Sequence, residues 1–285
     1  MLHVKVNATS ANVCVGFDVL GLALDLANNF TFEKSDEFSF VGFEDAYSNV
    51  NNNLVYDAYV ELFKYLNLEP IRVQIGYKGE IPVSRGLGSS SSLIVAGMMG
   101  ANAMAGYPLA KDEVFNLCAK MEGHPDNVAP AVYGGLVASY NVNGDFKAIN
   151  YEVSNKLKFF VIIPPFKIST NEARGVLPKS LSYSELVHNM SRIVNLPKAF
   201  SDGDIKLLND LFDDRIHEPY RSKLIKGYDE IKRVCTENNS VLAISGSGST
   251  MLVISYEDSI VDKLIDFGYE VKALEIGSGA EIKEV

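Results

Sequence analysis

The chain has 285 residues, of which 47% are hydrophobic and 22% are charged, a globular composition that excludes a disordered or collagen-like protein. Its formal net charge of −10 at pH 7 argues against bulk attraction to nucleic acid or anionic lipid, so any phosphate site must be local. Cys14, Cys118 and Cys235 form no CxxC pair, which predicts free thiols in a reducing compartment. The amino-terminal segment lacks a signal-peptide pattern and no apolar run reaches about 18 residues, so we expect a cytoplasmic protein.

Apolar periodicity in the first half of the chain predicts β-structure interleaved with helices. The uncharged run at 93–104 is too short to span a bilayer, and it predicts a helix buried in the core. In chain order, we expect a strand at 4–6, a hairpin over 30–40, a helix at 54–66, a strand at 71–77, the core helix at 93–104 and a helix at 112–122 that is ended by Gly123.

The pattern restarts near Tyr151, which predicts two domains, 1–150 and 151–285. The element order is that of an α+β protein, because strands and helices do not alternate regularly. In the second half we expect strands at 159–163, 241–244, 251–255 and 269–274, and helices at 184–200, 204–212, 220–236 and 259–267.

The segment 82–92, Pro-Val-Ser-Arg-Gly-Leu-Gly-Ser-Ser-Ser-Ser, carries the strongest functional signal. Glycines let the backbone approach a phosphate, serines add hydroxyl donors, and a helix N-terminus adds about half a positive charge. A flexible linker or a plain helix cap is the alternative, but the position between a predicted strand and the core helix favours a phosphate loop. A Walker A motif, the paired HRD and DFG motifs of protein kinases and the GxSxG motif of serine hydrolases are absent from the sequence.

Three further polar segments are candidates for substrate and metal binding. Glu122-Gly123-His124-Pro125-Asp126-Asn127 combines an acid, an imidazole and an amide, and Glu122 offers the oxygen ligand that Mg²⁺ prefers. A turn is the alternative for this segment, for the polar segment 7–18 with Asn12 and Asp18, and for the glycine-rich segment 244–250. Arginines suit the binding of a carboxylate, although many are simply solvated. The arginine candidates are Arg174, Arg215 and Arg221.

In combination, these segments resemble the GHMP small-molecule kinases, which carry three ordered motifs. The form P-x-x-x-G-L-G-S-S-[SA] is matched completely from Pro82 to Ser91, and the first and third motifs are matched by 7–21 and 245–250. The resemblance spans essentially the whole chain. Within the family, the homoserine-phosphorylating branch is matched by Thr-Ser-Ala-Asn at 9–12, Gly-Phe-Asp at 16–18, Glu-Gly-His-Pro-Asp-Asn-Val-Ala-Pro-Ala at 122–131 and the neighbourhood of Arg174.

The resemblance implies a fold, a reaction and a set of site residues. The fold would be an N-terminal domain like the second domain of ribosomal protein S5, followed by a ferredoxin-like domain. ATP with Mg²⁺ would phosphorylate L-homoserine to O-phospho-L-homoserine in threonine biosynthesis. Ser90 and Glu122 would bind the metal. The nucleotide would contact Pro82, Val83, Ser84, Arg85, Gly86, Leu87, Gly88, Ser89, Ser90, Ser91, Ser92, Gly246 and Gly248.

The implied acceptor pocket consists of polar residues from all parts of the chain. Because homoserine is a zwitterion, its ammonium would pair with a carboxylate such as Asp18, and its carboxylate with Arg174 or Arg221. Phosphoryl transfer needs positioning more than a strong base, so Asn127, Asp18 or neither would take the proton. The implied catalytic residues are Asn127, Asp18 and Arg174, and the implied acceptor-binding residues are Asn12, Asp18, His124, Asn127, Arg174 and Arg221.

Other functions remain open from the sequence. Another kinase of the family would act on mevalonate, shikimate or a sugar, and the pairing of Asp18 with an ammonium is the feature that disfavours these acceptors. A ligand sensor that had lost turnover would have no need of Gly88, Ser90, Glu122 and Gly246. Kinases of this family are often dimers, so we also expect a homodimer.

Overall fold

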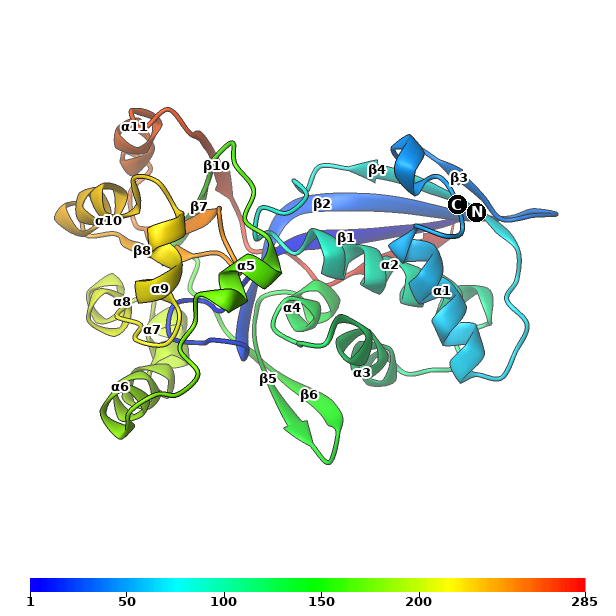
Figure 1. The fold of residues 1–285 in the computed structure, drawn as a ribbon, viewed down its shortest axis with the longest axis horizontal. Coiled ribbons are helices and arrows are strands. Elements are labelled where there is room, and N and C mark those ends of the chain that lie inside the picture. Colours follow the sequence, from blue (N-terminus) through cyan, green and yellow to red (C-terminus); the bar gives the residue numbers. More distant parts are fainter. Residues whose placement is uncertain (285) are drawn as a thin grey trace.

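Two β-sheets lie end to end in the computed structural model, which describes residues 1–284 (Figure 1). The larger, seven-stranded sheet has the order β11-β1-β2-β4-β3, and β5 and β6 branch from β2 as a hairpin. Its strands are β1 (Leu2–Ala11), β2 (Leu20–Lys34), β3 (Ser39–Val41), β4 (Val73–Gly79), β5 (Leu136–Val142), β6 (Asp145–Tyr151) and β11 (Glu281–Glu284).

The smaller sheet is antiparallel and confirms the predicted ferredoxin-like part. Its order is β10-β7-β9-β8, so the fourth strand of this region lies beside the first, and the third separates the first from the second. This is the strand order of a β-α-β-β-α-β fold. The strands are β7 (Lys158–Ile163), β8 (Val241–Ile244), β9 (Met251–Ser255) and β10 (Glu270–Leu274).

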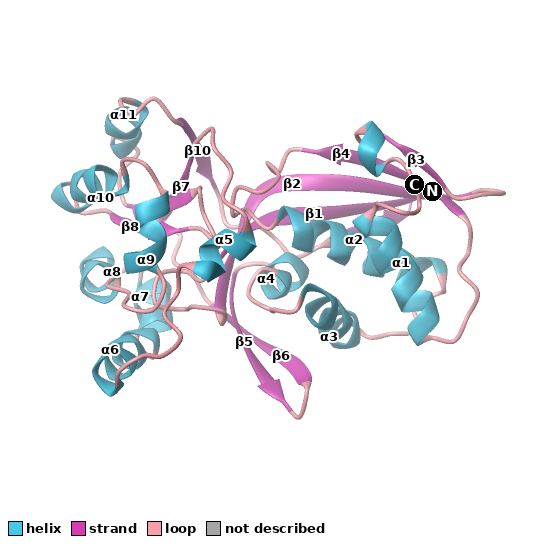
Figure 2. Cartoon of the chain, in the orientation of Figure 1, coloured by secondary structure: helices cyan, strands magenta, loops and turns pink. Residues whose placement is uncertain are grey.

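Helices gather against one side of the larger sheet (Figure 2). The predicted core helix is confirmed, and its first turn is made of the four serines, so that it begins at Ser89. It packs closely on its neighbour, since a Cβ on Gly97 would lie 2.3 Å from the carbonyl oxygen of Val55. The helices are α1 (Leu54–Tyr65), α2 (Ser89–Met104), α3 (Lys111–Glu122) and α4 (Val128–Tyr133), with a short 3₁₀ turn at Asp45–Tyr47.

The helices beside the smaller sheet are more broken than the periodicity predicts. The helix expected at 184–200 ends at Ile193, and the next one begins at Leu196, with Pro197 in its first turn, where a missing N–H costs nothing. The helix expected at 220–236 is interrupted at Gly227, whose φ is 78°. The elements are α5 (Thr170–Gly175), α6 (Tyr183–Ile193), α7 (Leu196–Asp202), α8 (Ile205–Leu211), α9 (Glu218–Arg221), a 3₁₀ turn at Ser222–Leu224, α10 (Tyr228–Glu237) and α11 (Ile260–Ile265).

The hairpin predicted over 30–40 is wrong. β4 occupies the edge of β2 from Asn28 to Lys34, in antiparallel register, and β3 pairs with the far edge of β4 in parallel. The alternating phenylalanines identified two strands correctly, but alternation reports which face of a strand is buried and not which strand is its neighbour.

The end of the chain returns to the first sheet. β11 pairs antiparallel with β1, with Leu2 opposite Glu284, and the two termini lie side by side in Figure 1. An apolar layer that includes Leu22 and Leu136 from the larger sheet and Val161 and Leu252 from the smaller one packs between the two. The predicted domain division at residue 150 stays a prediction. Within residues 1–284, no helix is both long and apolar enough to cross a membrane.

Candidate active site

A cavity of about 570 Å³ lies where the two halves of the chain meet, and the predicted phosphate loop forms one wall of it. Gly86 and Gly88 have φ of 79° and 69°, a region that favours glycine. A Cβ on Gly88 would lie 2.0 Å from Thr9 Oγ1, and one on Gly86 would lie 2.1 Å from the carbonyl oxygen of Ser245. Gly88 is also the N-cap of α2, so this wall ends in the unpaired N–H groups and positive dipole of a 16-residue helix.

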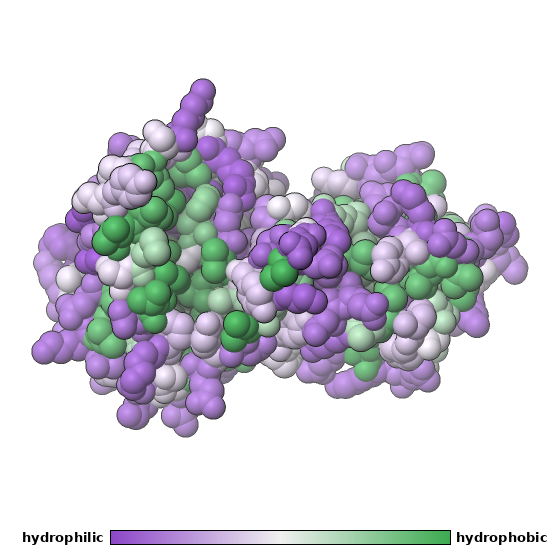
Figure 3. Space-filling view, turned by 90° about the horizontal axis from the view of Figure 1, so that it is seen from below, coloured by the Kyte–Doolittle hydropathy of each residue, from purple (hydrophilic) through white to green (hydrophobic). Residues whose placement is uncertain are grey.

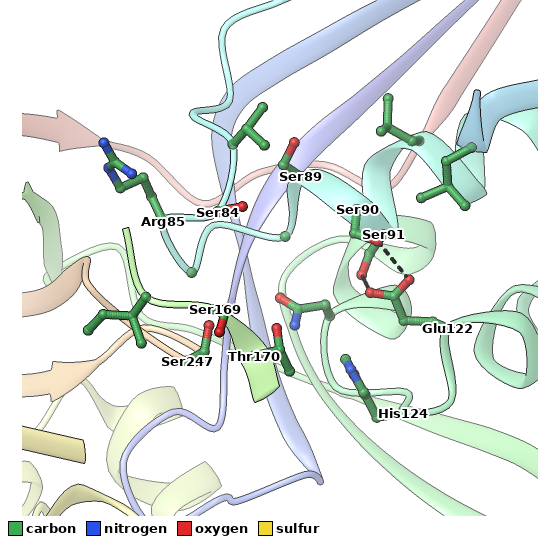
Figure 4. Close-up of a pocket in the computed structure, with 18 of the residues that line it drawn as sticks. Ser84, Arg85, Ser89, Ser90, Ser91, Glu122, His124, Ser169, Thr170 and Ser247 are labelled. Carbon is green, nitrogen blue, oxygen red and sulfur yellow. Dashed lines mark hydrogen bonds between the residues drawn. The ribbon is translucent and has the colours of Figure 1, made fainter. Parts of the chain in front are cut away.

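The predicted metal ligands lie together at the start of α2 (Figure 4). Ser90 Oγ donates to Glu122 Oε2 at 3.1 Å, and Ser91 Oγ donates to Oε1 at 3.0 Å. Glu122 is the last residue of α3, which ends in the left-handed Gly123. A carboxylate with two hydroxyls is the hard-oxygen donor set that suits magnesium. Ser91 was not among the predicted metal ligands.

Asp18 and Arg174 also line the cavity and contact each other. The guanidinium donates to both carboxylate oxygens, at 3.0 Å and 2.9 Å, which is the bidentate geometry typical of arginine. These hydrogen bonds raise the pKa of Arg174, against the opposing effect of burial. From the sequence, the two groups were assigned to opposite ends of a zwitterion, and the structure pairs them with each other.

Arg221 is almost wholly buried, with 2% of its surface exposed. Its Nη1 donates to the carbonyl oxygen of Gly246 at 3.0 Å, and its Nε donates to that of Ala173 at 3.1 Å. Burial, with the nearby charge of Arg174 as a second cause, lowers the pKa of Arg221. Arg221 and Arg174 both line the cavity.

Asn12 connects the first motif to the third. Its Nδ2 donates to the carbonyl oxygen of Gly246 at 3.0 Å, and its Oδ1 accepts from the backbone N–H of Asp18 at 2.9 Å. Its side chain thus holds the loop that carries Asp18 against the glycine-rich loop of the other half of the chain.

His124 and Asn127 reach the cavity from the segment between α3 and α4. His124 Nδ1 lies 3.0 Å from Oδ1 of the buried Asp126, and this hydrogen bond is the main cause that raises the pKa of His124. Asn127 Oδ1 accepts a 2.7 Å hydrogen bond from Thr9 Oγ1. Sequence reasoning gave Thr9 and Asp126 no role, although both lie inside the motifs that carry the family resemblance.

The third motif, residues 245–250, makes hydrogen bonds to the backbone of the predicted phosphate loop. Ser245 Oγ donates to the carbonyl oxygen of Gly86 at 2.7 Å, and the N–H of Thr250 donates to that of Arg85 at 3.1 Å. Gly246 lines the cavity. The cavity lining within residues 1–284 does not include four of the residues predicted to contact the nucleotide, namely Pro82, Leu87, Ser92 and Gly248.

An aromatic side of the cavity went unpredicted. Phe43, Tyr47 and Tyr77 line it together with Val83, of which only Val83 was predicted, and the rings of Phe43 and Tyr77 stack with their centroids 4.9 Å apart. Aromatic residues scattered over the segment 43–77 have the same pattern as core residues, so their sequence carried no separate signal.

Comparisons with known proteins agree with this arrangement. The GHMP kinase N-terminal domain model matches residues 53–135, and the C-terminal model matches 196–270. Homoserine kinase of Clostridium botulinum (strain ATCC 19397 / Type A) is 40% identical over 275 residues, covering 96% of this chain and 91% of that protein. Homoserine kinase of a Picosynechococcus species (strain PCC 7002) is 39% identical over 264 residues, covering 89% and 87%.

A solved structure leads to the same family. The crystal structure of homoserine kinase from Cytophaga hutchinsonii superposes with a TM-score of 0.88 at 27% identity, and the match covers 99% of this chain and 97% of that one. The fold and the phosphate loop thus define an ATP-dependent small-molecule kinase. The chain belongs to the GHMP kinases and, within them, to the homoserine kinase family.

Proposed function

We propose that this chain transfers the γ-phosphate of ATP to the hydroxyl of L-homoserine, giving O-phospho-L-homoserine for threonine biosynthesis. The observation that carries this proposal is the Asp18–Arg174 pair, which brings one carboxylate and one guanidinium into the same cavity as the predicted phosphate loop. An amino acid presents the complementary ammonium and carboxylate, whereas mevalonate, shikimate and sugars lack the ammonium.

The nucleotide would lie along the segment 83–91. The N-terminus of α2 and the loop backbone would bind its phosphates, and the aromatic side at Phe43 and Tyr77 would receive its base. Ser90, Ser91 and Glu122 would hold Mg²⁺, which supplies charge neutralisation between the phosphates when bound.

The acceptor would separate Asp18 from Arg174 and pair with both. Its ammonium would bind Asp18 while its carboxylate would take the fork of Arg174, so each charged side chain would keep a partner of opposite sign. Because Asn127 Oδ1 already accepts from Thr9, the Asn127 amide would present its N–H donors to the cavity and would orient the hydroxyl rather than deprotonate it. Asp18, paired with the ammonium of the acceptor in this arrangement, is likewise an unsuitable base.

The test is ADP release from MgATP with the purified protein, offered homoserine, mevalonate, shikimate and galactose in separate reactions. Turnover with homoserine alone is expected. Turnover with another acceptor would keep the kinase and refute the pocket assignment. ATP binding without turnover of any acceptor would favour the ligand sensor.

We also propose a cytoplasmic homodimer. The buried free thiols of Cys14, Cys118 and Cys235 suit a reducing compartment. An apolar surface on the helical side of the second half, visible in Figure 3, would suit a second copy. Sedimentation equilibrium would give the mass of two chains, and a Val187→Asp variant would give the mass of one. The apolar surface includes Tyr183, Leu186, Val187, Met190 and Val194, which are 88%, 41%, 61%, 54% and 72% exposed.

A further inference from the structure

The loop that carries Asp18 contains three residues in an unfavourable backbone conformation. Asn12, Cys14 and Asp18 have φ of 67°, 54° and 56°, in the left-handed region that costs free energy for residues with a side chain. Such conformations persist only where the surrounding structure fixes them. The side chain of Asn12 joins the two ends of this loop, and the N–H of Gly16 donates to the carbonyl oxygens of Asn12 and Val13. The carbonyl oxygen of Cys14 has its partner outside the loop.

His217 supplies that partner from a distant part of the chain. Its ring is fully buried, and its Nε2 lies 2.8 Å from the carbonyl oxygen of Cys14. Because a carbonyl can only accept, Nε2 carries the proton and donates it to this hydrogen bond. Nδ1 has no hydrogen-bond partner within the described part of the chain.

The imidazole ring of His217 also contacts the side chain of Phe17. The two rings stack with centroids 5.5 Å apart and an angle of 29°. The guanidinium of Arg221 lies 5.2 Å from the centroid of Phe17, and that of Arg174 lies 5.9 Å from it, both within cation–π range. His217 therefore contacts the loop twice. It donates to the carbonyl oxygen of Cys14, and it stacks on Phe17, whose ring both cavity arginines contact.

The backbone that carries His217 is itself fixed. The buried Asp214 accepts from the N–H groups of residues 216, 217 and 218, at 2.6 to 3.0 Å, through one carboxylate oxygen. The N–H of Arg221 donates to the carbonyl oxygen of His217 at 3.0 Å. His217 and Arg221 thus lie at the two ends of one helical turn, so the position of one is tied to the position of the other.

We infer that His217 is a positioning residue of the acceptor site, which holds the segment 12–18 through the carbonyl of Cys14 and through its stack on the ring of Phe17, a ring that both arginines also contact. This inference rests on the proposed function, because it assigns to that acceptor site a residue that does not line the cavity. His217 acts only through Asp18, Arg174 and Arg221, so its loss weakens acceptor binding and leaves the phosphate loop intact.

Two substitutions separate the two contacts of the ring. His217→Phe keeps a ring against Phe17 and removes the donor, and His217→Gln keeps an N–H donor at a similar position and removes the ring. We expect His217→Phe to raise KM for homoserine roughly 10-fold, since it leaves the Cys14 carbonyl buried without a partner. His217→Gln should raise it less, by about three-fold, and KM for ATP should stay within about two-fold in both variants.

His188→Gln is the matched control. His188, on α6, also points its Nε2 at a backbone carbonyl oxygen, that of Asp213 at 2.9 Å, but it does not contact the segment 12–18. It should leave both KM values unchanged. An unchanged KM for homoserine in folded His217→Phe would overturn the inference, and so would an equal rise in both KM values. If His217→Phe does not fold, His217→Gln and Phe17→Leu are judged by the same criterion.

The wild-type acceptor panel separates this inference from the proposed function. Turnover with a different acceptor would refute homoserine as substrate, and the same variants would then be compared by KM for that acceptor. Absence of turnover would refute the proposed function alone, and calorimetric titration with homoserine would then compare the variants by binding. Equal homoserine binding by wild type and His217→Phe would contradict the role of His217.

Discussion

The proposed phosphate side and the proposed acceptor side of the cavity are built in different ways. The phosphate side comes mainly from one continuous segment, 83–91, joined by Glu122 at the end of the next helix. The acceptor side assembles Asp18, Asn127, Arg174 and Arg221 from four separate parts of the chain. A continuous site can be recognised from its sequence, whereas an assembled site depends on every contact that aligns its segments.

The largest effect is expected from Glu122→Gln, on the phosphate side. Removing the charge of this carboxylate should lower kcat/KM about 100-fold or more at a fixed magnesium concentration, because a hard cation prefers a charged oxygen. ADP release measured across a magnesium titration should show the half-saturating concentration moving upward. Glu113→Gln on the same helix removes a carboxylate charge but keeps an oxygen that can accept from the N–H of Ala110, and it should leave the magnesium dependence unchanged. A wild-type magnesium curve for Glu122→Gln would reject the metal assignment.

Arg174→Ala should have the next largest effect, which we expect on KM for homoserine. Losing two charge-assisted hydrogen bonds should raise KM for homoserine roughly 10- to 100-fold, with KM for ATP nearly unchanged. Arg174→Lys keeps the charge but cannot make the fork, so most of the loss should remain. The measurement is initial velocity with each substrate varied in turn. Equal effects on the two KM values would show that the two sides of the cavity are not separate.

A matched pair of glycines tests the shape of the phosphate loop. Gly88→Ala would place a Cβ 2.0 Å from Thr9 Oγ1, whereas Gly106, with φ of 84°, has nothing within 4 Å of its Cβ position. Each variant should lose about 1–2 kcal/mol of unfolding free energy from its left-handed backbone. Only Gly88→Ala should also raise KM for ATP, by about 10-fold. Chemical denaturation and ATP kinetics on both variants measure the two effects, and a similar KM change at Gly106 would contradict this explanation.

The smallest effect concerns pH. The hydrogen bond to Asp126 raises the pKa of His124 above its ordinary value of 6.5, so the protonated ring stabilises the folded state. This contribution is complete below the pKa of the unfolded imidazole and is lost as pH rises through the higher folded pKa. In thermal unfolding from about pH 5.5 to 8.5, the advantage of wild type over Asp126→Asn should shrink as pH rises. A constant difference in Tm would show that the hydrogen bond does not favour the protonated ring.

The fold was predicted well where the signal is local. The apolar run ending at Met104 and the helix ended by Gly123 were placed within a few residues, because a helix is built from contacts three and four residues apart. The partners of strands were predicted poorly. β3 joins β4 rather than β2, and β11 joins β1 from the other end of the chain, since a strand's hydrogen bonds go to residues that its own pattern does not specify.

The site follows the same division. The glycines and serines of the segment 82–92, and Glu122 with its neighbouring His124, are recognisable as candidates in the amino-acid sequence. The hydrogen bond from Thr9 to Asn127, the stack of His217 on Phe17 and the pairing of Asp18 with Arg174 are not. Each of these contacts joins residues more than 100 positions apart in the sequence.

The sequence by itself determined the family and predicted the phosphate loop and the residue types of the proposed acceptor site, because these depend on residues adjacent in the chain or on motifs whose order is visible there. Only the tertiary structure decided that Asp18 pairs with Arg174, that Arg221 donates to the carbonyl oxygen of Gly246 and that the ring of His217 contacts the carbonyl oxygen of Cys14. The physical reason is that buried polar groups must find partners wherever the packed core brings a donor to an acceptor, and that choice belongs to the whole fold.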